Sequence, residues 1–368
     1  MINPKNRTMV EAPAVPGYTV IVESIGSATP GVSKVLAEGL GLPVEIVLKA
    51  LYSTPSVMFS NVDQETAAQT EDLLTKLGLE TRVQSASEPV PESPETVDVG
   101  LYLHDASALP LVCQQLSEFI GCSDAEALNM LLAEPSVVLG GVSMSTAEAL
   151  SKRVSAEVVV SNPKTELYTL MVKNSDEMLK HQLQNYFRHH NMDVDLSQSL
   201  AVEDLDYETT NAIWRKFQST GLVQVVNQSF QRFEIILNEV DTSNGNYRKV
   251  LTEHVGMPEE VIDEVLANLP IELETGLNRV DLAERLPAFK EAGLSCTANV
   301  LDTGRHYLII EQMGNQEATR TILAQFFPQD ELPVSAPWTS PSAMGDLLLR
   351  FATHQLEAAG CELDYKPA

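Results

Sequence analysis

The chain has 368 residues, and its 51 acidic and 24 basic side chains give a formal net charge of −27 at pH 7. Nucleic acids and anionic lipid surfaces are bound through clustered lysines and arginines, so this balance argues against both classes of partner. Hydrophobic residues make up 44% of the chain and charged residues 20%, which is typical of a sequence that buries cores.

Location and redox state are predicted from the same composition. The N-terminal tail, residues 1–17, lacks the apolar run of a secretory signal, and no stretch is apolar for long enough to cross a bilayer. No two of the cysteines form a C-x-x-C pair, so we expect four buried free thiols: Cys113, Cys122, Cys296 and Cys361. These features together predict a cytoplasmic protein.

Residues 18–84 predict a small unit with the order β-α-α-β-α-β. In chain order we expect a strand at 18–23, a helix over 31–39, a helix that begins at Pro43 and ends before Pro55, a strand at 57–59, a helix capped by Asp63 and closed by Gly78, and a strand at 79–83. From the third helix, Ala67, Leu73, Leu74 and Leu77 are expected to face inward.

The pattern of residues 18–84 recurs without a gap at residues 233–299, shifted by 215 positions. Gly41-Leu42-Pro43 falls on Gly256-Met257-Pro258, Pro55 on Pro270, and Gly78-Leu79 on Gly293-Leu294. Such self-similarity indicates that one folding unit was copied along the chain. The same order can be read in three further segments, which predicts an α+β protein of five tandem modules: 18–84, 97–162, 163–229, 230–302 and 303–368, called modules 1 to 5.

The joins and the irregular modules qualify this organisation. Residues 85–96 are rich in Pro and acidic residues and predict an extended linker, whereas the later joins are short and favour a packed array of the last four modules. Module 3 is degenerate because its second helix would fall on the short, polar segment 193–203. In module 5, prolines at 328, 333, 337 and 341 replace that helix by an irregular loop that carries Trp338. Pro287 predicts that the third helix of module 4 is kinked or starts late.

Two modules resemble members of one known superfamily. Module 1, with Gly39-Leu40-Gly41-Leu42-Pro43-Val44-Glu45, Asp63-Gln64-Glu65 and Leu77-Gly78-Leu79-Glu80, is similar to the C-terminal domain of the bacterial ribosomal stalk protein. Module 2, with His104-Asp105-Ala106 and Ala127-Leu128-Asn129-Met130-Leu131-Leu132, resembles the Clp-protease adaptor. The resemblance implies modules that bind proteins or peptides through helices and exposed edges.

The resemblance transfers to few residues. The stalk domain recruits translation factors with lysines on its first two helices, and here only Lys34 and Lys49 lie in that neighbourhood. The adaptor holds its client with acidic, amide and His groups; Asp105 matches in type, but Glu134-Pro135 stands where the His is expected. Neither activity is therefore carried over. Trp338 is either a plug under its loop or an exposed anchor for a partner, and with Lys34, Lys49 and Asp105 it completes the candidate partner-binding residues.

Other constellations have simpler explanations. His181, His189, His190, Asp193 and Asp195 form the densest set of potential metal ligands, but a solvated helix end is favoured over a metal site. A strand that leads into a helix cap is favoured over a cation loop for Asp204, Asp206 and Glu208. Core packing is favoured over a nucleophilic pair for Cys113 and His104.

The sequence contains no Gly-rich phosphate loop and no nucleophile elbow, so we predict no catalytic residues and no cofactor. The leading interpretation is a non-enzymatic adaptor, scaffold or structural subunit that binds a protein or peptide partner or associates with itself. The alternative is an enzyme or small-ligand sensor with its site in a cleft between modules, which clustered acids or histidines at such a cleft would support.

Overall fold

The computed structural model describes residues 17–29, 31–92, 94–172, 177–192, 194–196, 201–221, 223–301 and 304–368. Three predictions lie wholly or partly outside these ranges: the tail up to residue 16, the role of Asp193, and the short polar segment 193–203 of module 3, of which residues 193 and 197–200 are not described. The chain divides into two compact units. Unit 1 extends to Val97 and includes Leu116–Cys122 and Gly141–Val154, and unit 2 consists of Asp98–Gln115, Ser123–Gly140 and Ser155–Ala368.

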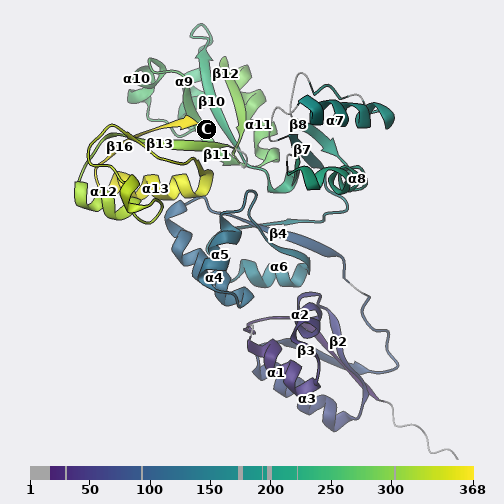
Figure 1. Cartoon of the computed structure of the whole chain (residues 1–368). Helices are drawn as coiled ribbons and strands as arrows, with labels where there is room; N and C mark the ends of the chain where they lie inside the picture. Colours follow the sequence, from purple (N-terminus) through teal and green to yellow (C-terminus); the bar gives the residue numbers. More distant parts are fainter. Residues whose placement is uncertain are drawn as a thin grey trace, which may run out of the picture. The chain divides into compact units, whose positions relative to one another are not determined.

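The predicted α+β class is confirmed, because helices alternate with small antiparallel sheets (Figure 1). Four sheets have three strands each, in the orders β2-β1-β3, β5-β4-β6, β8-β7-β9 and β11-β10-β12. The fifth sheet has four strands, and its β13 pairs with β14, β15 and β16. In each sheet, the strand that comes first in the sequence lies in the centre.

The first sheet and its helices follow the prediction for residues 18–84 closely. They are β1 Tyr18–Ser24, α1 Gly31–Leu40, α2 Val44–Tyr52, β2 Ser56–Val62, α3 Gln64–Lys76 and β3 Glu80–Ser85. Asp63 caps α3 by accepting a hydrogen bond from the Thr66 amide. Ala67 and Leu74 are buried as expected, but the prediction for Leu73 was wrong: 53% of its surface is exposed. A surface helix buries only the face that packs against the core, and Leu73 lies outside that face.

Unit 1 joins this sheet to two later segments of the chain. Arg153 donates hydrogen bonds to the carbonyls of Gly26 and Ala28, the latter at 3.0 Å. The Thr54 hydroxyl lies 2.7 Å from that of Ser145. Polar groups therefore connect module 1 to residues 141–154, within the same compact unit.

The second and third sheets have similar element orders. The second comprises β4 Thr96–Tyr102, η1 Ala106–Ala108, α4 Leu109–Ile120, α5 Asp124–Leu131, β5 Val137–Ser143, α6 Met144–Ser151 and β6 Glu157–Ser161. The third comprises β7 Tyr168–Val172, α7 Glu177–His189, β8 Ala201–Leu205, α8 Tyr207–Phe217, η2 Gln218–Thr220, β9 Val223–Asn227 and η3 Gln228–Phe230. Leu183 and Phe187 of α7 are fully buried in the core of the third sheet.

The fourth sheet shows that Pro287 neither delays nor ends its helix. The elements are β10 Phe233–Val240, α9 Tyr247–Glu253, η4 Glu259–Val261, α10 Ile262–Leu266, β11 Ile271–Leu277, α11 Arg279–Glu291 and β12 Leu294–Val300. Helix α11 begins 215 positions after α3 and continues through Pro287, so the expected late start was wrong. Asn278 caps the helix at the position that corresponds to Asp63.

The fifth sheet carries the irregular loop that its prolines predict. Its elements are β13 Arg305–Gln312, α12 Gln316–Leu323, η6 Gln329–Glu331, β14 Trp338–Thr339, β15 Met344–Gly345, α13 Asp346–Ala358 and β16 Glu362–Pro367. Between α12 and β15 the chain forms only a 3-10 turn and a two-residue strand, which confirms the loop. Figure 1 shows α13 running beside β13 and β16.

Residues with positive φ recur at three places in these elements. They follow the first helix at Gly41, Gly121, Asn191 and Gly256, lie in the second strand at Asn61, Gly141, Asp204 and Gly276, and follow the third helix at Gly78, Gly221, Gly293 and Gly360. Left-handed backbone is costly for residues with a Cβ, and Asn and Asp tolerate it better than others. This requirement explains the Gly, Asn and Asp at these places. Cis peptide bonds precede Pro55, Pro135, Pro270 and Pro337.

Within the described ranges, no helix is both long enough and apolar enough to cross a membrane.

Candidate functional site

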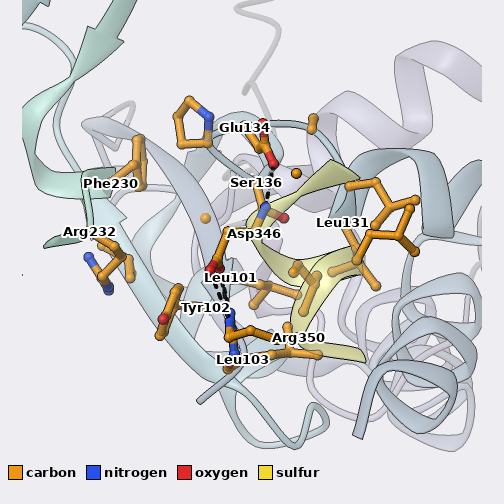
Figure 2. Close-up of a pocket in the computed structure, with 18 of the residues that line it drawn as sticks. Leu101, Tyr102, Leu103, Leu131, Glu134, Ser136, Phe230, Arg232, Asp346 and Arg350 are labelled. Atoms are coloured by element: carbon orange, nitrogen blue, oxygen red, sulfur yellow. Dashed lines mark hydrogen bonds and ion pairs between the residues drawn. The ribbon is translucent and has the colours of Figure 1, made fainter. Parts of the chain in front are cut away.

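A cavity of about 130 Å³ lies in unit 2, at the end of β4 and the start of α13 (Figure 2). Its wall is formed by residues from modules 2, 4 and 5 and from the η3 turn: Gly100–Leu103, Leu131–Ser136, Val159, Phe230, Arg232, Arg305, Gly345–Leu348 and Arg350. The cavity is therefore a cleft between predicted modules, of the kind expected for the alternative function.

Tyr102, the last residue of β4, joins segments that are distant in the sequence. The guanidinium carbons of Arg232 and Arg350 lie 4.9 and 5.3 Å from the centre of its ring. The ring of His104 meets it edge-on at 4.9 Å. A Cβ added at Gly276 in β11 would lie 2.5 Å from the hydroxyl oxygen of Tyr102. Because cation–π contacts strengthen when both groups leave water, this arrangement fixes Tyr102 against three other segments.

Arg232 is a charged side chain in the interior, with 2% of its surface exposed. Its Nη2 donates to the Glu157 carboxylate at 2.9 Å, and its Nη1 donates to the carbonyl of Gln231 at 3.0 Å. The second carboxylate oxygen of Glu157 lies 2.8 Å from Nε2 of His104. Burying a charge is costly unless it is paired and hydrogen-bonded, and Glu157 supplies that compensation.

Arg350 connects α13 to the end of β4. Its Nε and Nη2 donate to Asp346 at 3.0 and 2.8 Å, and its Nη1 donates to the Leu103 carbonyl at 2.7 Å. Burial acts to lower the pKa of Arg350, but hydrogen bonding to Asp346 and the charges of Asp346, Tyr102 and Glu272 together raise the pKa above its ordinary value. The guanidinium therefore stays charged, as its role in binding backbone carbonyls requires.

Glu134 reaches the N-terminus of α13 from module 2. Its Oε1 accepts a hydrogen bond from the Asp346 amide at 3.1 Å, and its backbone carbonyl accepts one from Gln224 at 3.0 Å. Gly345 is the N-cap residue directly before the helix and has no side chain to cap it, and a Cβ there would overlap the Glu134 carboxylate. A carboxylate satisfies free amides and the dipole of a helix N-terminus. Glu134 thus caps a helix that lies 212 residues further along the chain.

A second cavity, of about 480 Å³, shares Asp346 and Arg350 with the first and lies between modules 4 and 5. Its polar lining is mainly acids and histidines: Glu234, Glu272, His306, His354 and Glu357. Burial raises the pKa of Glu272, and the nearby carboxylates of Glu234 and Asp346 raise it further, while Arg350 opposes the shift. Among the described residues, no group of three or more His, Cys, Asp or Glu side chains is placed to hold a metal ion.

The candidate partner-binding residues are not brought together in these cavities. Lys34 on α1 and Lys49 on α2 are exposed on unit 1. Asp105 caps the η1 turn, where its carboxylate accepts a hydrogen bond from the Ser107 amide at 2.8 Å. Hydrogen bonds from the Ser107 side chain and amide lower the pKa of Asp105. A structural cap accounts for Asp105, and its role in partner binding stays a prediction.

Trp338 packs against the core of the fifth sheet. Its ring meets Phe327 at 5.7 Å, and its Nε1 donates to the Glu331 carbonyl at 3.2 Å. The side chain is partly buried. This placement agrees with a plug under the Pro-rich loop, and a further role as a binding anchor stays a prediction.

The remaining candidates are accounted for by local structure. Asp206 caps α8 through the Thr209 amide, as the strand-and-cap interpretation predicts. Cys113 donates to the Asp124 carbonyl, whereas His104 pairs with Glu157. His190 follows the last turn of α7, and its ring lies 4.3 Å from the Tyr186 ring with the two planes tilted by 36°.

Sequence reasoning missed Tyr102, Arg232 and Arg350, and it recorded Glu134 only as a departure from a family pattern. None of the four belongs to a motif. The one signal was the presence of the arginines Arg232 and Arg350 in a strongly acidic chain, which is too weak to identify a site.

Comparison with known proteins adds no assignment: no family model, no curated protein and no solved structure matches the chain.

Proposed function

We propose that the chain is a non-enzymatic repeat protein that binds a protein or peptide partner through helices α1 and α2. The observation that carries this proposal is a set of large apolar side chains exposed on this helix pair. Val35 on α1 is 55% exposed, Leu42 in the turn is 45% exposed, and Ile46 on α2 is 55% exposed. Exposed apolar groups that are close in a structure are a common mark of protein-binding surfaces.

Module 4 provides an internal comparison for this surface. At the corresponding positions, Val250 and Met257 pack against the core of the fourth sheet, and Val261 is 37% exposed. The same pattern of residues is therefore covered more fully in module 4 than in module 1. Lys34 and Lys49 flank the exposed groups along α1 and α2 and supply charges that suit a partner with acidic residues.

The module organisation is part of the same proposal. We infer five tandem β-α-α-β-α-β modules related to the stalk domain and the Clp adaptor, with modules 3 and 5 altered. The shared central first strand and the recurrent positive-φ positions support this inference. Repeated modules suit a scaffold, because several weak contacts on one chain gain by avidity.

The experiment is quantitative co-purification with the tagged chain, read by mass spectrometry beside light scattering of the pure protein. We expect a stoichiometric protein partner, or self-association, in the wild type. The double variant Val35→Asp/Ile46→Asp should lose it, because two buried carboxylates would oppose the apolar contact.

The matched control is Leu73→Asp, which introduces the same charge at an equally exposed leucine on α3 of the same module. It should retain the partner. A wild-type chain that stays monomeric and recovers no stoichiometric partner would refute the adaptor function. Loss of binding in the Leu73 control would refute the assignment to α1 and α2.

A further inference from the structure

We propose that the cavity beside Tyr102 binds a small organic monocarboxylate with a short apolar chain. This proposal is independent of partner binding by α1 and α2, because the cavity lies in unit 2 and those helices lie in unit 1.

The size and lining of the cavity set the ligand's size and polarity. A water molecule occupies about 30 Å³ of liquid, so a cavity of about 130 Å³ has the volume of about four water molecules. Covalently bonded atoms pack more densely than the molecules of a liquid, so a compact ligand of roughly six non-hydrogen atoms matches this volume. Much of the wall is apolar: Leu348 is among the lining residues, and Figure 2 shows Leu101, Leu131 and Phe230 on different sides of the space. A few polar groups on an otherwise apolar wall are typical of small-molecule sites.

Arg305 supplies the group that recognises a carboxylate. Three arginines, Arg232, Arg305 and Arg350, are among the residues that line the cavity, in a chain whose acidic residues outnumber its basic ones by 51 to 24. Arg232 and Arg350 already bind protein carboxylates. The Arg305 side chain is exposed and has no hydrogen-bonded or ion-paired partner among the described residues. A free guanidinium fork matches a carboxylate in shape and charge.

The start of α13 adds positive potential on the same wall. Gly345, Asp346 and Leu347 line the cavity, and the first amides of a helix have no partner within the helix. Glu134 occupies one of these amides. The protein's own carboxylate thus already uses this wall as an anion site, and the proposed ligand binds beside it, between the helix start and Arg305.

The carboxylates on the wall restrict the charge of the ligand. Glu134 and Asp346 would repel a doubly charged phosphate, and an apolar wall gives its remaining oxygens nothing to bind. An amine would lie next to three guanidinium groups. A single negative charge with a short hydrocarbon chain satisfies both the arginine and the apolar wall.

The test measures binding of butyrate to the full chain by ligand-observed NMR and titration calorimetry, with butyramide as an isosteric neutral probe and butylamine as a cationic probe with the same number of carbon atoms. We expect butyrate to bind at least about tenfold more tightly than either probe, since only butyrate pairs with a guanidinium. Arg305→Gln should weaken butyrate binding by at least about tenfold. Glu134→Gln should strengthen it several-fold, because the amide oxygen still accepts from Asp346 while a like charge is removed.

Arg215→Gln is the control, because Arg215 is an exposed arginine on α8 outside the cavity. It should bind butyrate as the wild type does, and thermal unfolding of all variants confirms that they are folded. The proposal is overturned by any of three results: no butyrate binding up to about 50 mM, the weak limit for a six-atom ligand; binding of butyramide or butylamine as tight as that of butyrate; or unchanged butyrate binding in Arg305→Gln.

Discussion

Arg350 and Asp346, one turn apart on α13, form an ion pair that lines both the cavity beside Tyr102 and the cavity of about 480 Å³ between modules 4 and 5. The same guanidinium reaches the Leu103 carbonyl at the end of β4. A change at this pair therefore alters two cavities and one contact between distant segments together.

Removing the Arg350 charge should destabilise unit 2. Arg350→Met keeps most of the side-chain stem but leaves Asp346 and the Leu103 carbonyl without their donor, and we expect a loss of about 2 kcal/mol in the free energy of unfolding. Urea unfolding followed by tryptophan fluorescence measures this loss, since both Trp214 and Trp338 lie in unit 2. The control is Lys249→Met, which breaks an exposed pair with Glu253 and should cost less than about 0.5 kcal/mol. Equal losses in the two variants would contradict a structural role for Arg350.

The contact between Gly276 and Tyr102 can be tested with alanine. Gly276 and Gly256 both have positive φ, near 75° and 77°, but a Cβ at Gly256 would meet nothing within 4 Å. Gly256→Ala should therefore lower the free energy of unfolding only by the strain of placing alanine in left-handed backbone, about 1 kcal/mol. Gly276→Ala should cost at least about twice as much, because its methyl group also displaces Tyr102. Urea unfolding measures both losses in the free energy of unfolding. Losses that agree within error for Gly256→Ala and Gly276→Ala would show that Tyr102 does not approach β11.

The cap on α8 should give unit 2 a measurable dependence on pH. Hydrogen bonds from the Thr209 amide and hydroxyl lower the pKa of Asp206 below its ordinary value of 3.8. The stabilisation by this carboxylate is present above the unfolded pKa, and it is lost as the pH falls through the folded pKa. Asp206→Ala should cost about 1 kcal/mol at pH 7.

Asp206→Asn is the matched variant, because asparagine also caps a helix but does not titrate. Its loss relative to wild type should shrink as the pH is lowered from 6 toward 2, when measured by denaturation at each pH. A difference that stays constant over this interval would argue against a lowered pKa.

Cys296 should react slowly in the folded protein. Burial raises the pKa of its thiol to about 11 from an ordinary value of 9.0. Because the thiolate is the nucleophile, alkylation at pH 8 should be about a hundredfold slower than for a free thiol. Peptide mapping after timed iodoacetamide treatment measures the rate, and labelling in urea provides the control. The prediction of four buried thiols was wrong for Cys296 and Cys122, which are only partly buried. Native labelling at the denatured rate would therefore contradict the raised pKa of the Cys296 thiol.

Local signals were enough to predict the order of elements within residues 18–84. Glycines and prolines marked the ends of α1, α2 and α3, and Asp63 marked a helix start, because caps and left-handed residues act within a few positions of the chain. The exposure of Leu73 could not be predicted, since helical spacing identifies an apolar side chain but not what covers it. The late helix start predicted from Pro287 was wrong for a related reason. Local propensity predicts a disturbed helix, whereas the surrounding core determines whether the helix persists.

The sequence by itself determined the α+β class, the repeated pattern of residues 18–84 and 233–299, and the irregular loop that carries Trp338. These properties depend on periodicity and on residues with special backbone geometry, which are visible in a short window of sequence. Only the tertiary structure decided that Tyr102, Glu134, Arg232 and Arg350 lie around one cavity. Their contacts join residues up to 248 positions apart (from 102 to 350), and such contacts arise from packing between segments, which leaves no periodic trace in the chain.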